Sequence, residues 1–284
     1  MSEMIDALRA WVGKSEQAEE RADAWPVIGL AAALDQPREA WPVEGEPISP
    51  TAHWCYFSGR VAQSALDHDG HPHRGGVIPP FPMPRRMWAG SRLAFHLPIR
   101  IGDTISLTTA VSDVSVKEGR SGTLGFVTLA HTWRTPAGVA RVEHQDLVYR
   151  EPPDPAQPAP PAREAPRDAD WSASYCPDAA QLFRYSAVTF NAHRIHYDLA
   201  YATTVEGYPG LVVHGPLIAT LLLQTWQQQH PHAVLQQFAF RAVSPLFCGE
   251  RLHAEGRRAD AGESALWARH DDGRLLMQAT VRWA

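Results

Sequence analysis

The run Tyr185-Ser-Ala-Val-Thr-Phe-Asn-Ala-His-Arg-Ile-His-Tyr-Asp198, followed by Gly210-Leu-Val-Val-His-Gly-Pro216, is the most informative part of this 284-residue chain. It places an amide, Asn191, shortly before an imidazole, His196. Pro216 then opens a stretch in which apolar residues recur at helical spacing, and proline is favoured at the first position of a helix. The sequence therefore predicts a helix over Pro216 to Gln229 that begins next to a proton-handling group.

Composition and charge narrow the class of protein. The chain is 44% hydrophobic and 20% charged, and its net charge of −5 with no basic run predicts no nucleic-acid partner. Its three cysteines lie far apart without a CxxC pair, which is typical of a reducing compartment. The apolar stretch Leu211 to Leu223 is interrupted by a His-Gly-Pro triplet, and the N-terminus has no apolar signal core. We expect a cytoplasmic protein with no membrane partner.

A proline-rich segment divides the chain. Residues 151–166 contain seven prolines, which exclude a helix or an inner strand and favour an extended connector. We expect an N-terminal domain over residues 1–150, a linker over 151–168 and a C-terminal domain over 169–284, each domain of ordinary size.

The two halves share a fragment that predicts duplication of one fold. Pro98, Gly102 and Asp103 align with Pro245, Gly249 and Glu250, and in each half the Gly-acidic turn leads into a strand-like run. Helical periodicity is confined to Ser2 to Val12, Ala22 to Leu34 and Pro216 to Gln229. Alternating patterns predict strands over Thr104–Val116, Thr123–Thr135, Val139–Tyr149, Phe238–Val243, Arg251–Arg258, Ser264–His270 and Leu275–Trp283. This is an α+β pattern with antiparallel strands.

The residue types around His196 indicate hydration chemistry. Adding water to an α,β-unsaturated thioester requires a base for the water, an acid for Cα and a donor for the enolate oxygen. A neutral imidazole suits the proton transfers, and N–H groups at a helix N-terminus suit the oxyanion. We therefore assign His196 as the base and acid, and the N–H of Gly215 as the oxyanion donor. Asn191 cannot act as a base, so it is expected to orient the water or the ring.

The same run carries a family resemblance. Asn191-Ala-His-Arg-Ile-His-Tyr-Asp198 with His214-Gly215 resembles the signature of the MaoC-like hydratases and dehydratases, in which Asp-x-Asn-Pro-(Ile/Leu)-His-x-Asp precedes a His-Gly pair. The His and the trailing Asp are retained here. Asn191 stands where the family has its catalytic Asp, His193 replaces the family Asn, and Arg194 replaces the Pro.

The resemblance extends to one branch and to nearly the whole chain. Phe190 to Asp198 and Glu206 to Pro216 look like the type 2 hydroxyacyl-thioester dehydratases and the mesaconyl- and itaconyl-CoA hydratases. Pro79-Pro-Phe-Pro-Met-Pro-Arg-Arg-Met-Trp-Ala-Gly-Ser91 resembles their companion domain. The resemblance implies two hotdog domains, each an antiparallel sheet wrapped around a central helix, with a non-catalytic N-terminal domain. The first half has no Asn/Asp-x₄-His at the matching position, and its Asp67-His-Asp69 lies in a loop-like stretch.

The implied activity is reversible hydration of a 2-enoyl thioester, with a short branched dicarboxylyl-CoA such as mesaconyl- or itaconyl-CoA as the substrate. A general 3-hydroxyacyl-CoA or acyl-carrier-protein dehydratase is one alternative, and a non-catalytic acyl-CoA-binding protein is another. A hotdog thioesterase is disfavoured, because Pro216 to Gln229 contains no acidic residue. We expect an acyl-CoA or acyl-carrier-protein thioester as the partner, a homodimer or higher homo-oligomer, and no cofactor.

Substrate-binding residues are expected among the arginines and histidines of the segments that resemble the family. A guanidinium would bind a substrate carboxylate through two hydrogen bonds. Two His-rich pairs, His193/His196 and His71/His73, lack the ligand pattern of a known metal class, so no metal is expected. The candidate substrate-binding residues are Arg85, Arg86, Arg184, His193, Arg194 and His214.

Overall fold

The computed structural model of the chain describes residues 2–57, 59–119, 122–152 and 161–284, so most of the predicted linker, 153–160, lies outside the described residues. In this part of the chain, ten strands form one antiparallel sheet. The first half supplies β1 (Ser15–Arg21), β2 (Arg85–Phe95), β3 (Thr104–Gly119), β4 (Gly122–Thr135) and β5 (Gly138–Arg150). The second half supplies β6 (Trp171–Tyr175), β7 (Leu235–Ala242), β8 (Leu252–Asp260), β9 (Glu263–His270) and β10 (Leu275–Trp283).

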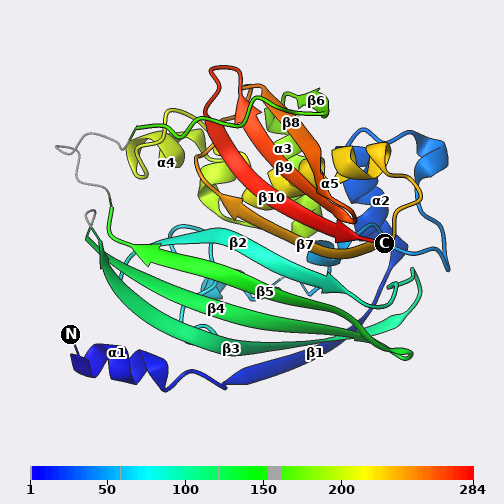
Figure 1. Cartoon of the computed structure of the whole chain (residues 1–284). Helices are drawn as coiled ribbons and strands as arrows, with labels where there is room; N and C mark the ends of the chain where they lie inside the picture. Colours follow the sequence, from blue (N-terminus) through cyan, green and yellow to red (C-terminus); the bar gives the residue numbers. More distant parts are fainter. Residues whose placement is uncertain (1, 58, 120–121, 153–160) are drawn as a thin grey trace.

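The two halves of the sheet have the same strand order. The first half runs β2-β5-β4-β3-β1 and the second runs β7-β10-β9-β8-β6. They are joined where β2 pairs with β7, from Gly90 opposite Arg241 to Ala94 opposite Gln237. Figure 1 shows this junction, with β2 directly beside β7. The sheet is therefore continuous across the whole molecule.

The repeated sequence fragment forms the same turn twice. The N–H of Arg100 donates to Oδ2 of Asp103 at 2.8 Å, and the N–H of Phe247 donates to Oε2 of Glu250 at 3.0 Å. The glycine before each acidic residue has a positive φ, +99° at Gly102 and +83° at Gly249, which favours glycine there. One turn leads into β3 and the other into β8, as the duplicated fragment predicts.

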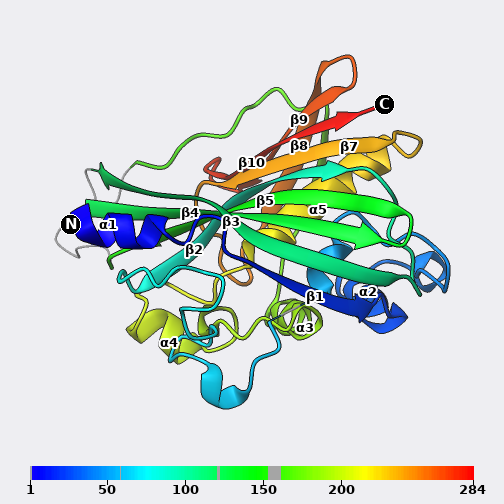
Figure 2. The ribbon, with the colours of Figure 1, turned by 90° about the horizontal axis from the view of Figure 1, so that it is seen from below.

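Five α-helices lie among the described residues: α1 (Ser2–Arg9), α2 (Ala24–Ala33), α3 (Ala179–Thr189), α4 (Leu199–Thr204) and α5 (Gly215–Gln229). α5 begins one residue before the predicted helix and is buried along most of its length, against β6, β8, β9 and β10. α2 packs against α3, and Figure 2 shows α2, α3 and α4 along the same side of β1–β5. No helix in the described ranges is both long and apolar enough to span a bilayer.

α3 was not predicted from the sequence. Phe183 and Phe190 leave most of their surface exposed, so the apolar residues of this segment do not gather on one face. The helix is instead set by its ends. Asp178 caps it by accepting a hydrogen bond from the N–H of Gln181 at 2.8 Å, and Phe190 ends it in a left-handed conformation. This end directs the chain into the run that contains Asn191 and His196.

One hydrophobic core spans both halves. It includes Leu30 of α2, Leu93 of β2, Leu222 of α5 and Phe238 of β7 in a single cluster of buried side chains. Because helices and strands of both halves contribute to this cluster, the halves do not pack as two separately closed units. This contiguous core holds the start of α5 in a fixed place relative to the first half.

The first half also buries a carboxylate. Glu143 of β5 is 2% exposed and accepts hydrogen bonds from Ser91 (2.5 Å), Trp54 (3.0 Å) and Nε2 of His53 (3.1 Å). Nδ1 of His53 in turn accepts from the guanidinium of Arg141 at 2.9 Å. Burial alone would raise the pKa of Glu143, but the hydrogen bond and charge of His53 and the hydrogen bond from Ser91 lower it to about 2. The carboxylate of Glu143 therefore has three polar partners inside the protein, whereas Nε of Arg141 has none among the described residues.

Replacing Glu143 by alanine should destabilise the protein strongly, because it leaves Arg141 and His53 buried without the carboxylate. We expect the free energy of unfolding to fall by about 3–5 kcal/mol. Urea denaturation measures this loss. Glu263→Ala, which removes a partly exposed pair with Arg282, is the matched control, with an expected loss below about 1 kcal/mol. Equal losses for the two variants would contradict a stabilising role of the buried network.

Candidate active site

The imidazole of His196 is fixed with one nitrogen available. The residue lies in a short 3-10 helix, Arg194–His196, and is 8% exposed. Its Nδ1 lies 2.7 Å from the carbonyl oxygen of Val212. Because a carbonyl only accepts, Nδ1 carries the hydrogen and Nε2 carries the lone pair. Nε2 forms no hydrogen bond with any described residue, so its lone pair is free of a partner within that part of the chain. Burial lowers the pKa of His196 to about 4, which keeps the ring neutral near pH 7.

The start of α5 lies against this ring. His214 stacks on His196 with ring centroids 3.7 Å apart and an angle of 18° between the planes. Its Nε2 hydrogen-bonds to Oγ of Ser186 at 2.8 Å. The next residue, Gly215, begins the helix, and a Cβ built there would meet no atom within 4 Å. Open space therefore lies next to the helix N-terminus, where N–H groups and the helix dipole favour a negatively charged oxygen.

Asn191 lies at the turn that precedes His196. Its Oδ1 accepts a hydrogen bond from the N–H of His193 at 2.9 Å, so its side-chain oxygen supports the local turn. The amide hydrogens are the groups that it can still offer to a water or a substrate. His193 meets His196 edge to face, with centroids 5.5 Å apart.

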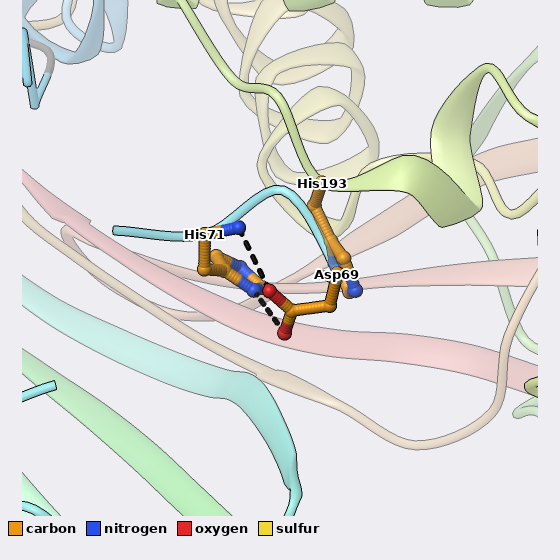
Figure 3. A group of neighbouring side chains, drawn as sticks. All are labelled: Asp69, His71 and His193. Atoms are coloured by element: carbon orange, nitrogen blue, oxygen red, sulfur yellow. Dashed lines mark hydrogen bonds and ion pairs between the residues drawn. The ribbon is translucent and has the colours of Figure 1, made fainter. Parts of the chain in front are cut away.

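A loop from the first half completes the cluster. Figure 3 shows Asp69 and His71 facing His193. Asp69 accepts hydrogen bonds from the backbone N–H of His71 at 2.8 Å and from its Nδ1 at 2.9 Å. The rings of His71 and His193 lie 4.1 Å apart. The loop is held by the N–H of Arg194, which donates to the carbonyl oxygen of Asp69 at 2.9 Å.

Asp69, His71 and His193 could also offer ligands to a cation, since one donor atom from each lies within 4.8 Å of the others. Two observations disfavour this use. Both oxygens of Asp69 already accept hydrogen bonds from His71, and Arg74 and Arg86 lower the pKa of His71 by charge repulsion. The same repulsion acts on a bound divalent ion.

His71, His193, His196 and His214 form a row of neighbouring imidazoles that ends at Asp69. Burial is the main cause that lowers the pKa of each imidazole, to about 2 for His193 and well below the ordinary range for His214. Burial alone would raise the pKa of Asp69, but the hydrogen bonds from His71 hold it below its usual range. At neutral pH the row is therefore uncharged, next to one carboxylate.

The four candidate arginines differ in their ion pairs and in their exposure to solvent. Arg85 forms an ion pair with Glu206, with Nε and Oε2 3.0 Å apart, and thereby ties β2 to the segment after α4. Arg194 pairs with Asp198 at 2.7 Å and donates to the carbonyl of His68, so it holds the loop in place. Arg184 is exposed on α3. Arg86 of β2 is half-buried, forms no ion pair with any described residue, and lowers the pKa of His71 and His193 by its charge.

The structure thus brings together His193, His196, His214 and Gly215, with Asn191 and Arg86 nearby. The sequence places Asp67 to Asp69 in a loop, which is correct, but the docking of this loop on the segment that contains His196 was missed. No local sequence pattern indicated this docking, which depends on Gly70: this glycine has φ +89°, and a Cβ there would lie 1.8 Å from the carbonyl oxygen of Ala192. None of these site residues lines the groove of about 810 Å³ that lies between the strands and the segment from Arg163 to Pro166.

These residues can perform a defined set of chemical steps. The open Nε2 of His196 can take a proton from water and return it to a carbon. The N-terminus of α5 can stabilise an oxyanion that forms in the space beside Gly215.

Comparisons with known proteins show the family of this chain. The family model described as hydroxyacyl-thioester dehydratase type 2 matches residues 51–248. The chain is 45% identical over 275 residues to mesaconyl-C(4)-CoA hydratase of Chloroflexus aurantiacus, with 96% of both chains covered. It is 28% identical over 230 residues to the mitochondrial hydroxyacyl-thioester dehydratase type 2 of Schizosaccharomyces pombe, covering 72% of this chain and 76% of the relative.

The fold is also shared with a solved structure. A MaoC-like dehydratase from Phytophthora capsici superimposes with a TM-score of 0.74 at 15% identity, covering 99% of this chain and 98% of the other. The α+β fold expected from the sequence is confirmed.

Gly70→Ala should displace the loop that carries Asp69 and His71, because its Cβ would overlap the carbonyl oxygen of Ala192. We expect the N–H of Arg194, which donates to Asp69, to exchange with solvent at least about 10-fold faster, as the loss of one hydrogen bond implies. Hydrogen exchange followed by mass spectrometry measures this. Gly75→Ala is the matched control, because Gly75 also has a positive φ but a Cβ there meets no atom within 4 Å. Equal exchange in both variants would show that the close contact at Gly70 does not hold the loop.

Proposed function

Because the chain belongs to the hydroxyacyl-thioester dehydratase type 2 family, we propose that it catalyses the reversible hydration of a 2-enoyl-CoA thioester, with His196 as the acid and base. The single observation that carries the proposal is the hydrogen bond from Nδ1 of His196 to the carbonyl of Val212, which leaves the lone pair on Nε2. A hydro-lyase needs such a group at neutral pH.

The proposed reaction proceeds through an enolate. Nε2 of His196 takes a proton from water while the water oxygen bonds to Cβ, and the electron pair of the double bond moves to the thioester oxygen. The N–H of Gly215 at the start of α5 stabilises that oxygen. The proton then passes from His196 to Cα, and the thioester carbonyl re-forms. One water has been added, and the imidazole has returned to its neutral state.

Asn191 differs from the carboxylate that the family signature has at this position. An amide cannot take a proton, so His196 serves both proton transfers in this proposal. The amide hydrogens of Asn191 hold the attacking water, while its oxygen keeps the turn before His196 in shape.

For the acyl chain we propose a short branched dicarboxylyl-CoA of the mesaconyl or itaconyl type. The Chloroflexus relative is named for such a substrate. Arg86 supports the choice, because a half-buried guanidinium without an acidic partner among the described residues lies close to His71 and His193. A substrate carboxylate would satisfy it. Arg85 is already paired with Glu206 and is a weaker candidate.

We propose coenzyme A as the carrier rather than an acyl carrier protein, and a homo-oligomer as the assembled form. A purely acyl-CoA-binding protein would have no need for an open basic nitrogen beside an oxyanion site. A general 3-hydroxyacyl-thioester dehydratase uses the same residues but does not need Arg86.

His196→Gln should abolish hydration while keeping the fold, because glutamine fills a similar volume but cannot take a proton. We expect kcat for hydration of mesaconyl-CoA, followed by loss of enoyl-thioester absorbance, to fall by at least about 100-fold. His73→Gln is the matched control, since His73 is exposed and lies outside the row of imidazoles. An active His196→Gln enzyme would remove His196 from the mechanism.

Arg86→Gln should change substrate preference rather than chemistry. Losing a charge-assisted contact to the substrate carboxylate should lower kcat/KM for mesaconyl-CoA by about 10-fold to 100-fold. The value for crotonyl-CoA, which has no free carboxylate, should change little. Arg184→Gln on the exposed face of α3 is the control and should alter neither value. Equal losses of kcat/KM with both substrates would show that Arg86 does not bind the substrate carboxylate.

A further inference from the structure

The proposed reaction creates a charge that the catalytic segment alone does not balance. When His196 takes a proton from water, the ring becomes a cation in a buried place. Asn191, at the position of the family carboxylate, is neutral. A buried charge without a partner is costly, so the site needs a nearby negative group at this step. The inference below rests on the proposed function, because the charge arises only in that reaction.

We propose that Asp69, acting through His71, supplies the negative charge that the catalytic segment lacks at Asn191. The carboxylate of the first half thus takes over the electrostatic task of the family residue. Asp69 is a positioning residue in this proposal, because it acts through His71 and the row of imidazoles rather than on the substrate.

The placement of Asp69 fits this task. Its side chain is 13% exposed and that of His71 is 21% exposed, so their interaction is only weakly screened by water. Both carboxylate oxygens bind His71, one through the ring and one through the backbone. The carboxylate therefore orients the ring and fixes its hydrogen on Nδ1, which leaves Nε2 of His71 as an acceptor.

The imidazole row connects this carboxylate to the reacting group. The ring of His71 lies 4.1 Å from that of His193, and the ring of His193 lies 5.5 Å from that of His196. The charge of Asp69 favours the protonated form of His193, the ring beside His196, so the carboxylate offsets a positive charge on this part of the row. When the proton moves to Cα, the row is neutral again and Asp69 keeps its charge throughout.

Backbone contacts of the loop hold the carboxylate of Asp69 beside the row of imidazoles. Gly70 lies so close to the backbone of Ala192 that no side chain fits, and the N–H of Arg194 binds the carbonyl of Asp69. The guanidinium of Arg194 also binds the carbonyl of His68. These contacts join the Asp69 loop to the segment that contains His196, so the two cannot move independently.

Several other ionisable groups lie near the row of imidazoles and affect how its protonation depends on pH. The charges of Arg74 and of Arg86 in β2 act on His71, and α3 contributes Tyr185, whose ring lies 4.9 Å from that of His214. Burial raises the pKa of Tyr185 well above the usual value, so Tyr185 stays neutral near pH 7. Asp69 is thus the group among these that can offset a positive charge on the row.

The test compares Asp69→Asn with wild-type enzyme in mesaconyl-CoA hydration. Asparagine keeps the shape and the hydrogen bond to the backbone of His71 but removes the charge. We expect kcat to fall by about 10-fold to 100-fold. The acid limb of the kcat/KM profile should move to lower pH, because without the carboxylate a protonated row is less stable. Asp67→Asn is the matched control, since Asp67 pairs with the exposed His68 in the same loop and should leave both readouts unchanged.

Rescue separates an electrostatic role from a structural one. Asn191→Asp restores a carboxylate next to His196, so the double variant Asp69→Asn/Asn191→Asp should regain at least about 10-fold of the lost kcat. Asp69→Asn activity within about threefold of wild type, or a loss with neither rescue nor a shifted pH profile, would overturn the proposal. So would stoichiometric divalent metal in the purified protein that is lost in Asp69→Asn. Inactivity of the wild-type enzyme would instead count against the proposed function.

Discussion

The hydrogen bond from Nδ1 of His196 to the carbonyl of Val212 is the interaction on which the site depends. It fixes the tautomer, so the lone pair is always on Nε2, and it fixes the plane of the ring. Stacking of His214 then places the start of α5 beside that plane. Because Val212 and His214 belong to the same short segment, one stretch of backbone positions both the proposed base and the proposed oxyanion donor.

The duplicated architecture explains how the site can be shared between halves. Both halves of the sheet have the same strand order and the same Gly-acidic turn, yet only the second carries the Asn191/His196 pair. The first half buries its own polar network around Glu143 and contributes a loop in place of a second site. In the proposed mechanism, the first half contributes Asp69, His71 and Arg86 to the site in the second half.

Much of the fold and part of the candidate site could be predicted from the sequence. The features that were missed have physical causes. The helix from Pro216 to Gln229 and seven of the ten strands follow from local patterns, whereas β1, β2 and β6 were not predicted. His196 and Gly215 follow from a motif within one short stretch. Asp69 and His71 lie more than a hundred residues from His196 in sequence. Their role depends on tertiary docking through Gly70 and Arg194, which no local pattern reports. Arg85 and Arg86 are neighbours in sequence but differ in setting, because adjacent strand residues face opposite sides of a sheet.

Because β2 pairs with β7, the two halves of the chain cannot be separated without exposing strand edges. A cut in the connection between β5 and β6 would leave each fragment with a long unpaired edge strand, and such edges recruit other strands and aggregate. Each fragment would also lose part of the common core. A gene encoding the halves separately would therefore have to ensure that they are made together and assemble at once, whereas a single polypeptide guarantees equal amounts of both.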